Sequence, residues 1–475
     1  MRRTFTFVAL SFGCIGMAIA QGVRTGREWM TVGGDAQRSS WIRSDPKISV
    51  ETLQRPGFQL TWKLATSGEP ILVSTLDHFS GSRGGRSFAL LSNASGELIT
   101  IDSDLGRIEW EKKISGASVT GKSGACRDEL ISNVARSATS EFGRGGGGRG
   151  RGSPAKSAVG QPDKGSPTLA PPAPNAFAGV HAGLRMMGAA AFFYAVSEDG
   201  KLHSVYASDG EEPAPAITFL PPNANVRQLT VIDDVAYAVT SKGCSGDAPD
   251  GVWSLNLTSK EAAHWTSTGR IAGFAIGPDS TVYVTTENGD LVALAPKALQ
   301  VRKIYHAANE VFTTSPVVFE YQSKVLVAAA THNHLHIVDA ATLTGAGYPA
   351  EISGRMAAWQ DESGTDWLAA PSKDSIVAWK ITDQGNTFVP RVGWNVSKAG
   401  MPLAPIVING VVFAVFNSPS AILHAFNADT GKELWNSGTV MTTGVRNGNL
   451  SGSASQLYLG TSDGTLYAFG FPIEH

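Results

Sequence analysis

Cysteine is scarce in this sequence, with 3 among 475 residues, and no two cysteines stand in a C-x-x-C pair. That absence excludes covalent attachment of c-type haem and cysteine-rich zinc sites. Cys14 lies in the apolar N-terminal run, so the mature chain carries Cys126 and Cys244. In an oxidising compartment these two could form a disulfide, and two free buried thiols are the alternative.

The sequence also lacks an excess of charge of one sign, and beyond the N-terminus it lacks long apolar runs. Charged residues make up 17% of the chain and the formal net charge is -2, so no nucleic-acid or anionic-lipid partner is predicted. Beyond the N-terminus no stretch is long and apolar enough to span a membrane, and no segment sustains a helical period. The composition therefore favours an all-β protein that is not embedded in a membrane.

The N-terminus has the pattern of an export signal over residues 1–20. Arg2 and Arg3 precede an apolar run from Phe5 to Ile19, which ends in the small-x-small site that precedes Gln21. The run is shorter than the roughly 20 residues that a membrane span needs. The mature protein is predicted to begin near Gln21 and to be periplasmic or secreted, and a twin-arginine signal or a lipoprotein site at Cys14 are open alternatives.

Eight pairs of apolar strands recur along the chain, each joined by a tight turn. Examples are FALLSNASGELITI from Phe88, VYVTTENGDLVAL from Val282 and LYLGTSDGTLYAF from Leu457. Glycine at the second turn position suits two-residue hairpins, and a spacing of about 40 to 50 residues is typical of four-stranded propeller blades. We predict an eight-bladed β-propeller of four-stranded antiparallel blades over residues 58–475, preceded by an extended segment at 21–57.

The last hairpin leaves too few residues for a fourth strand in its blade. The segment from Phe58 to Leu64 has the apolar and tryptophan pattern of an outer strand and lies before the first blade. We expect it to pair with the last blade and close the ring, which removes exposed sheet edges between the first and last blades.

A segment rich in Gly, Arg, Pro and Ser interrupts the second blade at residues 135–178. Its composition cannot bury a core, so a disordered insert is predicted. No Gly-Lys-Ser/Thr follows its glycines, so it does not match a phosphate-binding loop.

A recurring turn and tryptophan indicate how blades contact one another. Thr100–Trp110 aligns without a gap with Ala425–Trp435, which contains the sequence ADTGKELW. Gly431 is predicted to adopt the left-handed conformation, and Trp110 and Trp435 to bury their rings against neighbouring blades. If RDELISNV, from Arg127, is the inner strand of blade two, Cys126 and Cys244 would lie near the same rim and could form a disulfide between adjacent blades.

The stretch Ala425–Trp435 resembles the tryptophan-docking motif of pyrroloquinoline quinone (PQQ) type eight-bladed propellers, with Asn427 where that family favours Asp. Arg27–Ser49 is similar to the opening of such proteins. The resemblance implies either a periplasmic quinoprotein dehydrogenase, with PQQ and calcium at the axial mouth, or a non-enzymatic scaffold. The blades that contain Val292, Ile337 and Ile376 are expected to have lost the docking tryptophan.

Side chains that could support catalysis form no convincing group in the sequence, so no catalytic, cofactor-binding or metal-binding residue is assigned. A hairpin turn at Asn333 interrupts His332, His334 and His336, which argues against a metal site. Two acidic groups fall in or beside turns and are expected to be solvated: Asp209, Glu211 and Glu212, and Asp361, Glu362 and Asp366.

We therefore predict an exported, monomeric binding or scaffolding module whose partner is a protein or another envelope component. The alternative is a PQQ- and calcium-dependent dehydrogenase that oxidises an alcohol or sugar. An adaptor of the WD-repeat type is a third alternative, which the export signal and the docking motif disfavour.

Overall fold

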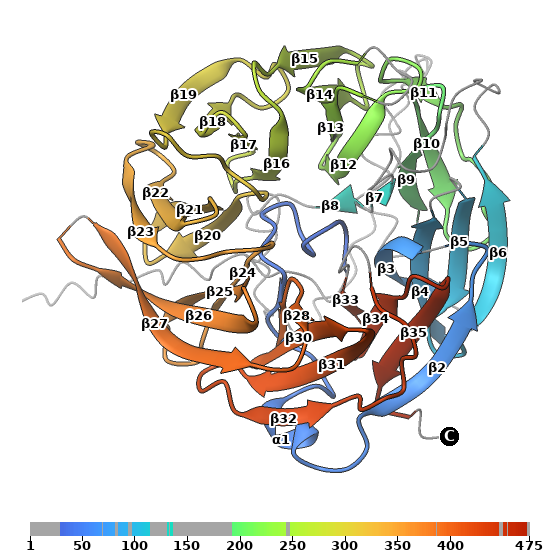
Figure 1. Cartoon of the computed structure of the whole chain (residues 1–475). Coiled ribbons are helices and arrows are strands. Elements are labelled where there is room, and N and C mark those ends of the chain that lie inside the picture. The colour runs from blue at the N-terminus through green and yellow to red at the C-terminus, as the bar shows by residue number, and fades with distance from the viewer. Residues whose placement is uncertain are drawn as a thin grey trace, which may run out of the picture.

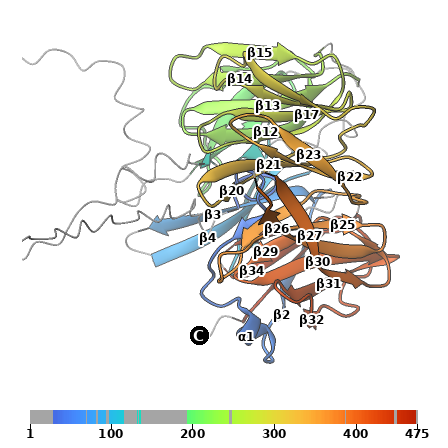
Figure 2. The same cartoon turned by 90° about the vertical axis from the view of Figure 1, so that its left-hand side faces the viewer.

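The strands form eight sheets arranged as blades around a central axis (Figure 1), and Figure 2 shows the same blades from the side. The computed structural model describes residues 29–68, 70–80, 84–93, 97–114, 131–132, 134–135, 192–243, 248–385, 387–445, 450–453 and 455–472. The predicted eight-bladed propeller of four-stranded antiparallel blades is confirmed.

The first four blades follow one another along the chain. From the inner to the outer strand, blade 1 is β3 (Pro70–Ser80), β4 (Gly84–Asn93), β5 (Glu97–Asp102) and β6 (Arg107–Lys113), and blade 2 is β7 (Ile131–Ser132), β9 (Phe192–Val196), β10 (Lys201–Tyr206) and β11 (Ile217–Thr218). Blade 3 is β12 (Asn225–Ile232), β13 (Val235–Ser241), β14 (Gly251–Asn256) and β15 (Ala262–Thr266), and blade 4 is β16 (Ile271–Ile276), β17 (Val282–Thr286), β18 (Asp290–Leu294) and β19 (Val301–His306).

The remaining blades continue in the same order until the last. Blade 5 is β20 (Val317–Tyr321), β21 (Lys324–Ala330), β22 (His334–Asp339) and β23 (Gly345–Pro349), and blade 6 is β24 (Ala357–Gln360), β25 (Asp366–Ser372), β26 (Ser375–Asp383) and β27 (Phe388–Ser397). Blade 7 is β29 (Ile406–Ile408), β30 (Val411–Ser418), β31 (Ser420–Asn427) and β32 (Glu433–Asn436), and blade 8 is β33 (Ser451–Ser453), β34 (Gln456–Gly460), β35 (Thr465–Gly470) and β2 (Gln59–Ala65).

Three short strands and one helical turn complete the described elements. They are β1 (Trp41–Ile42), which runs parallel to β29, β8 (Val134–Ala135), which runs parallel to β12, β28 (Met401–Pro402), which pairs with β30, and α1 (Val50–Leu53). No helix in the described part of the chain has the length and apolar character needed to cross a membrane.

The middle strands of each blade are buried on both faces because neighbouring blades cover them. Every residue of β17 is buried, whereas the outer strands β15 and β23 alternate between exposed and half-buried positions. The hairpin glycines Gly200, Gly289 and Gly464 have φ angles of 78°, 79° and 80°. This is the left-handed conformation that the sequence predicted for these turns.

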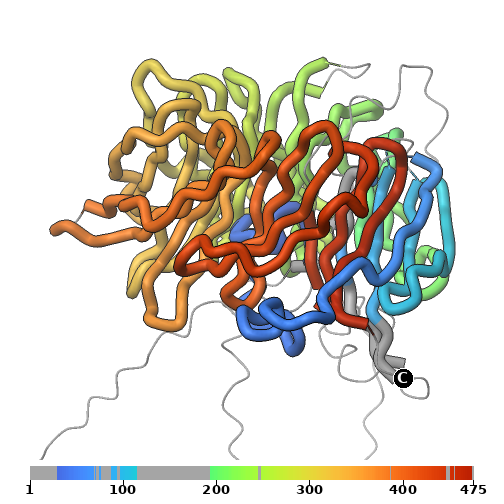
Figure 3. The backbone as a smooth tube through the Cα atoms, turned by 60° about the horizontal axis from the view of Figure 1, so that its bottom comes forward, coloured from blue at the N-terminus to red at the C-terminus, as the bar shows by residue number. Residues whose placement is uncertain are grey.

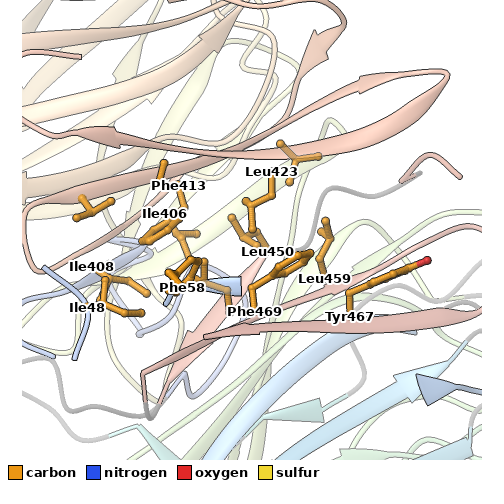
Figure 4. Close-up of a cluster of buried hydrophobic side chains, with 14 of the residues drawn as sticks. Ile48, Phe58, Ile406, Ile408, Phe413, Leu423, Leu450, Leu459, Tyr467 and Phe469 are labelled. Carbon is orange, nitrogen blue, oxygen red and sulfur yellow. The ribbon is translucent and has the colours of Figure 1, made fainter. Parts of the chain in front are cut away.

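The ring is closed by β2, as predicted. It pairs antiparallel with β35 of blade 8, and Figure 3 shows this blue strand lying against the red C-terminal strands. Phe58, which precedes β2, packs in an apolar cluster with Ile48 and with residues of blades 7 and 8, including Phe413 and Phe469 (Figure 4). Burial of these side chains stabilises the closure without a covalent link.

Several sequence predictions fall outside the described residues. These are the export signal at 1–20, Cys126 and Cys244, and nearly all of the insert at 135–178. The structure therefore bears on neither the disulfide nor the insert.

Candidate functional site

Residues 29–45, here named the axial segment, lie at the centre of the ring and bond to inner strands around it (Figure 1). Trp29 exchanges hydrogen bonds with Thr75 of β3, and the Thr31 hydroxyl donates to the Leu229 carbonyl of β12. Four backbone N–H groups of other inner strands donate to carbonyls of the axial segment: Ile276 to Ala36 at 2.7 Å, Val318 to Gln37 at 2.9 Å, Ala358 to Ser39 at 2.8 Å and Val407 to Ser40 at 2.8 Å. The axial segment thus contacts blades 1, 3, 4, 5, 6 and 7, and Asp45 accepts a hydrogen bond from Ser455 of blade 8.

Two buried charged residues hold the axial segment in place. Arg38 is 3% exposed, and its guanidinium donates to the carbonyls of Phe274 at 3.2 Å and of Val32 and to the Thr230 hydroxyl at 3.1 Å. The Asp35 carboxylate accepts from the backbone N–H and the hydroxyl of Ser39. Burial raises the pKa of Asp35 above its usual range, although the Ser39 hydrogen bonds oppose this shift.

The described axial residues do not match what calcium and PQQ require. Calcium takes six to eight oxygen ligands, and an anionic cofactor needs available cations. Both Asp35 oxygens are used by Ser39, and the Arg38 donors are directed at carbonyls and a hydroxyl within the protein. Within the described ranges, no three His, Cys, Asp or Glu side chains are placed to hold a metal ion.

Two equivalent Lys–Glu–His groups link neighbouring blades. Glu212 contacts Lys112 of blade 1 at 3.1 Å and Nδ1 of His203 in β10 at 3.0 Å. In the same way Glu433 contacts Lys398, which follows β27, and Nδ1 of His424 in β31 at 2.7 Å. The expectation that Glu212 is a solvated charge is wrong, because Glu212 pairs with Lys112 and His203. The dipeptide Leu-His recurs at the same position of the third strand in blades 2 and 7, and it places each imidazole beside a glutamate.

Burial would raise the pKa of Glu212 and Glu433, but hydrogen bonds from His and Lys outweigh it and lower the pKa of both carboxyls. Burial lowers the pKa of His424, although Glu433 opposes the shift. His424 is therefore favoured as the neutral imidazole whose Nδ1–H donates to Glu433.

The three histidines near the turn of blade 5 lie in different environments. His332 is exposed, His334 is half-buried and His336 is buried. Glu310 lies 3.0 Å from Nδ1 of His334 and 3.5 Å from Nε2 of His336, while the Tyr305 hydroxyl lies 3.0 Å from Nδ1 of His336. Burial lowers the pKa of His336, against the effect of Glu310. Glu310 and the two imidazoles therefore form a local polar cluster beside the turn.

The acidic group of blade 6 is not uniformly solvated. Asp366 is only 5% exposed, and the Gln360 amide donates to it at 3.2 Å, so the expectation of a solvated charge is wrong for this residue. Burial raises the pKa of Asp366 to about 7, with a further upward contribution from Asp361. The reason is that Asp366 begins the buried strand β25, whereas Asp361 lies in the turn and accepts bonds from Ser363, Thr365 and Trp367.

Replacing Asp366 by asparagine is expected to stabilise the protein at high pH. A carboxyl whose pKa is raised on folding costs stability as pH rises from about 4 through about 7, and a neutral amide avoids that cost. We expect D366N to raise the free energy of unfolding by about 1–3 kcal/mol at pH 8, given about 1.4 kcal/mol per pKa unit. Urea unfolding at pH 5 and pH 8 would measure the change.

The matched control is D361N, in the turn that precedes β25. Hydrogen bonds from Ser363 and Trp367 outweigh burial and lower the pKa of Asp361, so its charged form is stabilising above about pH 4. D361N should therefore lower stability at pH 8. A D366N gain of equal size at pH 5 and pH 8 would contradict a raised pKa.

Four tryptophans occupy one register position in the outer strands, directly beside a β-bulge. They are Trp62 in β2, Trp110 in β6, Trp394 in β27 and Trp435 in β32. The expectation that the blade containing Ile376 lacks this residue is wrong, because Trp394 lies there. Trp394 was missed because no ADTG-like turn precedes it in blade 6. The turn that its ring contacts, with Ala428 and Gly431, belongs to blade 7.

Three of these indoles bond to a turn of the following blade. Nε1 donates from Trp62 to the Ser103 carbonyl at 2.7 Å, from Trp110 to Ala207 at 2.8 Å and from Trp394 to Ala428 at 2.8 Å. Each ring lies against a glycine of that turn: Gly106, Gly210 and Gly431. Gly431 has φ of +70° and faces Trp394, while Trp435 packs edge-on against Phe58.

A surface groove of about 420 Å³ lies between blades 4 and 5. The register position that holds tryptophan in the four strands above is occupied by Lys303 in β19, again beside a bulge. The groove is lined by Pro278, Asp279, Thr281, Tyr283, Ala293, Arg302, Lys303, Ser323, Lys324, Val325, Asp339, Ala340 and Ala341.

Comparison with known proteins gives structural likeness without sequence likeness. No model of a known protein family matches the chain, and no curated protein matches it in sequence. A quinohemoprotein alcohol dehydrogenase from Comamonas testosteroni is 12% identical, with a TM-score of 0.59 over 95% of this chain and 82% of that one. A europium-containing methanol dehydrogenase is also 12% identical, with a TM-score of 0.56 over 94% and 99%.

A computationally designed protein, Ika8, matches with a TM-score of 0.53 at 11% identity, over 87% of this chain and 100% of that one. At identities this low, the structural likeness establishes the fold but not the function. The resemblance stated from the sequence is confirmed at that level, and the chain has the eight-bladed propeller fold that quinoprotein dehydrogenases share.

Proposed function

We propose that this protein is an exported propeller that acts as a binding or scaffolding module, and that its partner is a protein or another envelope component. The observation that carries the proposal is the axial segment. It places the chain's own residues, already hydrogen-bonded, at the centre of the ring where the dehydrogenase alternative requires a cofactor. Export to the periplasm or the medium rests on the signal pattern at residues 1–20.

The alternative is a PQQ- and calcium-dependent dehydrogenase of alcohols or sugars. The likeness in fold to a quinohemoprotein alcohol dehydrogenase and to a europium-containing methanol dehydrogenase, over 94–95% of the chain, favours keeping it. Against it stands the donor set described above, in which Asp35 and Arg38 already bond within the protein.

Titration of the mature protein with PQQ and calcium distinguishes the two functions. We expect no saturable change in the absorbance of PQQ at micromolar concentration, and no reduction of an artificial electron acceptor with mixed alcohols and sugars. A quinoprotein alcohol dehydrogenase assayed alongside is the positive control. Saturable binding with turnover would overturn the proposal and establish the dehydrogenase.

A further inference from the structure

The interface between blades 4 and 5 differs at two structurally equivalent positions from the interfaces between blades 8 and 1, 1 and 2, and 6 and 7. Lys303 stands where Trp62, Trp110 and Trp394 stand, and Leu343 stands where the following blade otherwise has a glycine. The equivalence of Leu343 rests on its backbone. It has φ of +52°, and its N–H donates to the carbonyl four residues earlier, as in Gly106, Gly210 and Gly431.

Polar contacts partly replace the missing indole. Nζ of Lys303 donates to the Ala341 carbonyl at 2.6 Å, in the turn that the tryptophans contact elsewhere. The Tyr283 hydroxyl donates to Ala340 at 3.3 Å, and burial raises the pKa of Tyr283, which keeps this donor protonated. A groove remains beside Lys303 because its narrow side chain does not fill the space that an indole would occupy.

The groove has an apolar wall and an excess of cations. Ala293, Tyr283 and Val325 supply the wall. In the described part of the molecule, neither Lys303 nor Lys324 is within ion-pair distance of an acidic side chain, and Nζ of Lys324 lies 5.0 Å from the centre of the Phe388 ring. Arg302 is only 3.8 Å from Asp279, and Asp339 is occupied in capping its own turn.

Exposed apolar side chains adjoin these cations on the same outer strand. Val301 and Ile304 in β19 are 47% and 55% exposed, respectively, and flank Arg302 and Lys303. Exposed apolar side chains beside cations form a surface that suits protein contacts in which an aromatic anchor enters a pocket and polar groups surround it.

We propose that this groove binds an aromatic side chain carried by an acidic segment of a partner polypeptide. The inference deepens the proposed binding function and rests on it. The aromatic identity follows from the three interfaces where the protein itself places an indole at this position. The acidic identity follows from Lys303 and Lys324, whose charges a carboxylate would neutralise, and the volume of about 420 Å³ lies within the usual range for binding pockets.

Fluorescence anisotropy with labelled hexapeptides tests the inference. The probe peptide carries one tryptophan among aspartates and glutamates, and the two comparison peptides replace the tryptophan by alanine or the acids by lysine. We expect saturable binding of the probe with Kd below about 1 mM, and at least about tenfold weaker binding of either comparison peptide. N-acetyltryptophan alone should compete poorly, and equal competition by it would show a small-molecule site in place of a polypeptide site.

Two variants locate the binding. The double variant K303W/L343G recreates the Trp–Gly pair of the other interfaces and should fill the groove, which abolishes probe binding without lowering thermal stability. K303Q/K324Q keeps the groove open and should weaken binding about three- to tenfold, with a smaller salt dependence. K260Q, at an exposed turn of blade 3, is the matched control and should bind as the parent does.

Unchanged binding in K303W/L343G, or absence of probe binding to the parent protein, would overturn the groove assignment. Neither result depends on PQQ, so failure of this inference and failure of the proposed function can be told apart by the cofactor titration.

Discussion

Replacing Arg38 by alanine is expected to lower the free energy of unfolding by about 3–5 kcal/mol, the usual effect of removing one partner from a buried charged network. The change leaves the carbonyls of Val32 and Phe274 without this donor and removes the cation near Asp35. Urea unfolding followed by tryptophan fluorescence would measure the loss.

The control for this prediction is R270A. Arg270 is a surface residue 3.6 Å from Glu287, and exposed ion pairs contribute roughly 0–1 kcal/mol. R38K should recover only part of the loss, because an ammonium group cannot reproduce the planar set of guanidinium donors. If R38A and R270A had equal effects, the axial segment would contribute little to stability.

Replacing Trp394 by alanine is expected to cost about 3–5 kcal/mol, the range for large aromatic side chains removed from a core. Trp394 is 7% exposed, bonds to Ala428 and lies against Gly431, so the change opens a cavity between blades 6 and 7. Differential scanning calorimetry or urea unfolding would report the effect.

Two further variants separate the contributions of the hydrogen bond and of the buried ring to the stability cost of W394A. W394F keeps most of the apolar area and loses the hydrogen bond, so it should cost about 1–2 kcal/mol. Val392 lies on the same strand and is 63% exposed, and V392A should change stability by less than about 0.5 kcal/mol. A W394A cost no greater than that of V392A would show that blade contacts do not depend on this indole.

Repetition made the fold predictable. Eight hairpins with glycine turns indicated the blades, and the apolar strand before the first blade indicated ring closure by β2. The same repetition allowed Trp110 and Trp435 to be placed at blade contacts, because each stands at a fixed distance from its turn. Lys303 stands at the same structural position, but a lysine gives no sequence signal for it.

Features without a repeat could not be predicted. The axial segment was expected only as an extended segment ahead of the blades, because Gly33, Gly34, Asp35 and Arg38 have the composition of a surface loop. Their burial depends on inner strands of blades far along the chain. Asp366 was misjudged because it stands directly after a solvated turn, as the first residue of the buried strand β25, and the sequence does not mark that boundary.

The position of the axial segment also constrains the order of events in biosynthesis. Asp45 bonds to Ser455 across 410 residues of sequence, and Thr66 bonds to Gly464 across 398. These contacts can form only after residues 455–464 have been synthesised, so the ring closes late, and contacts of such high sequence separation form slowly.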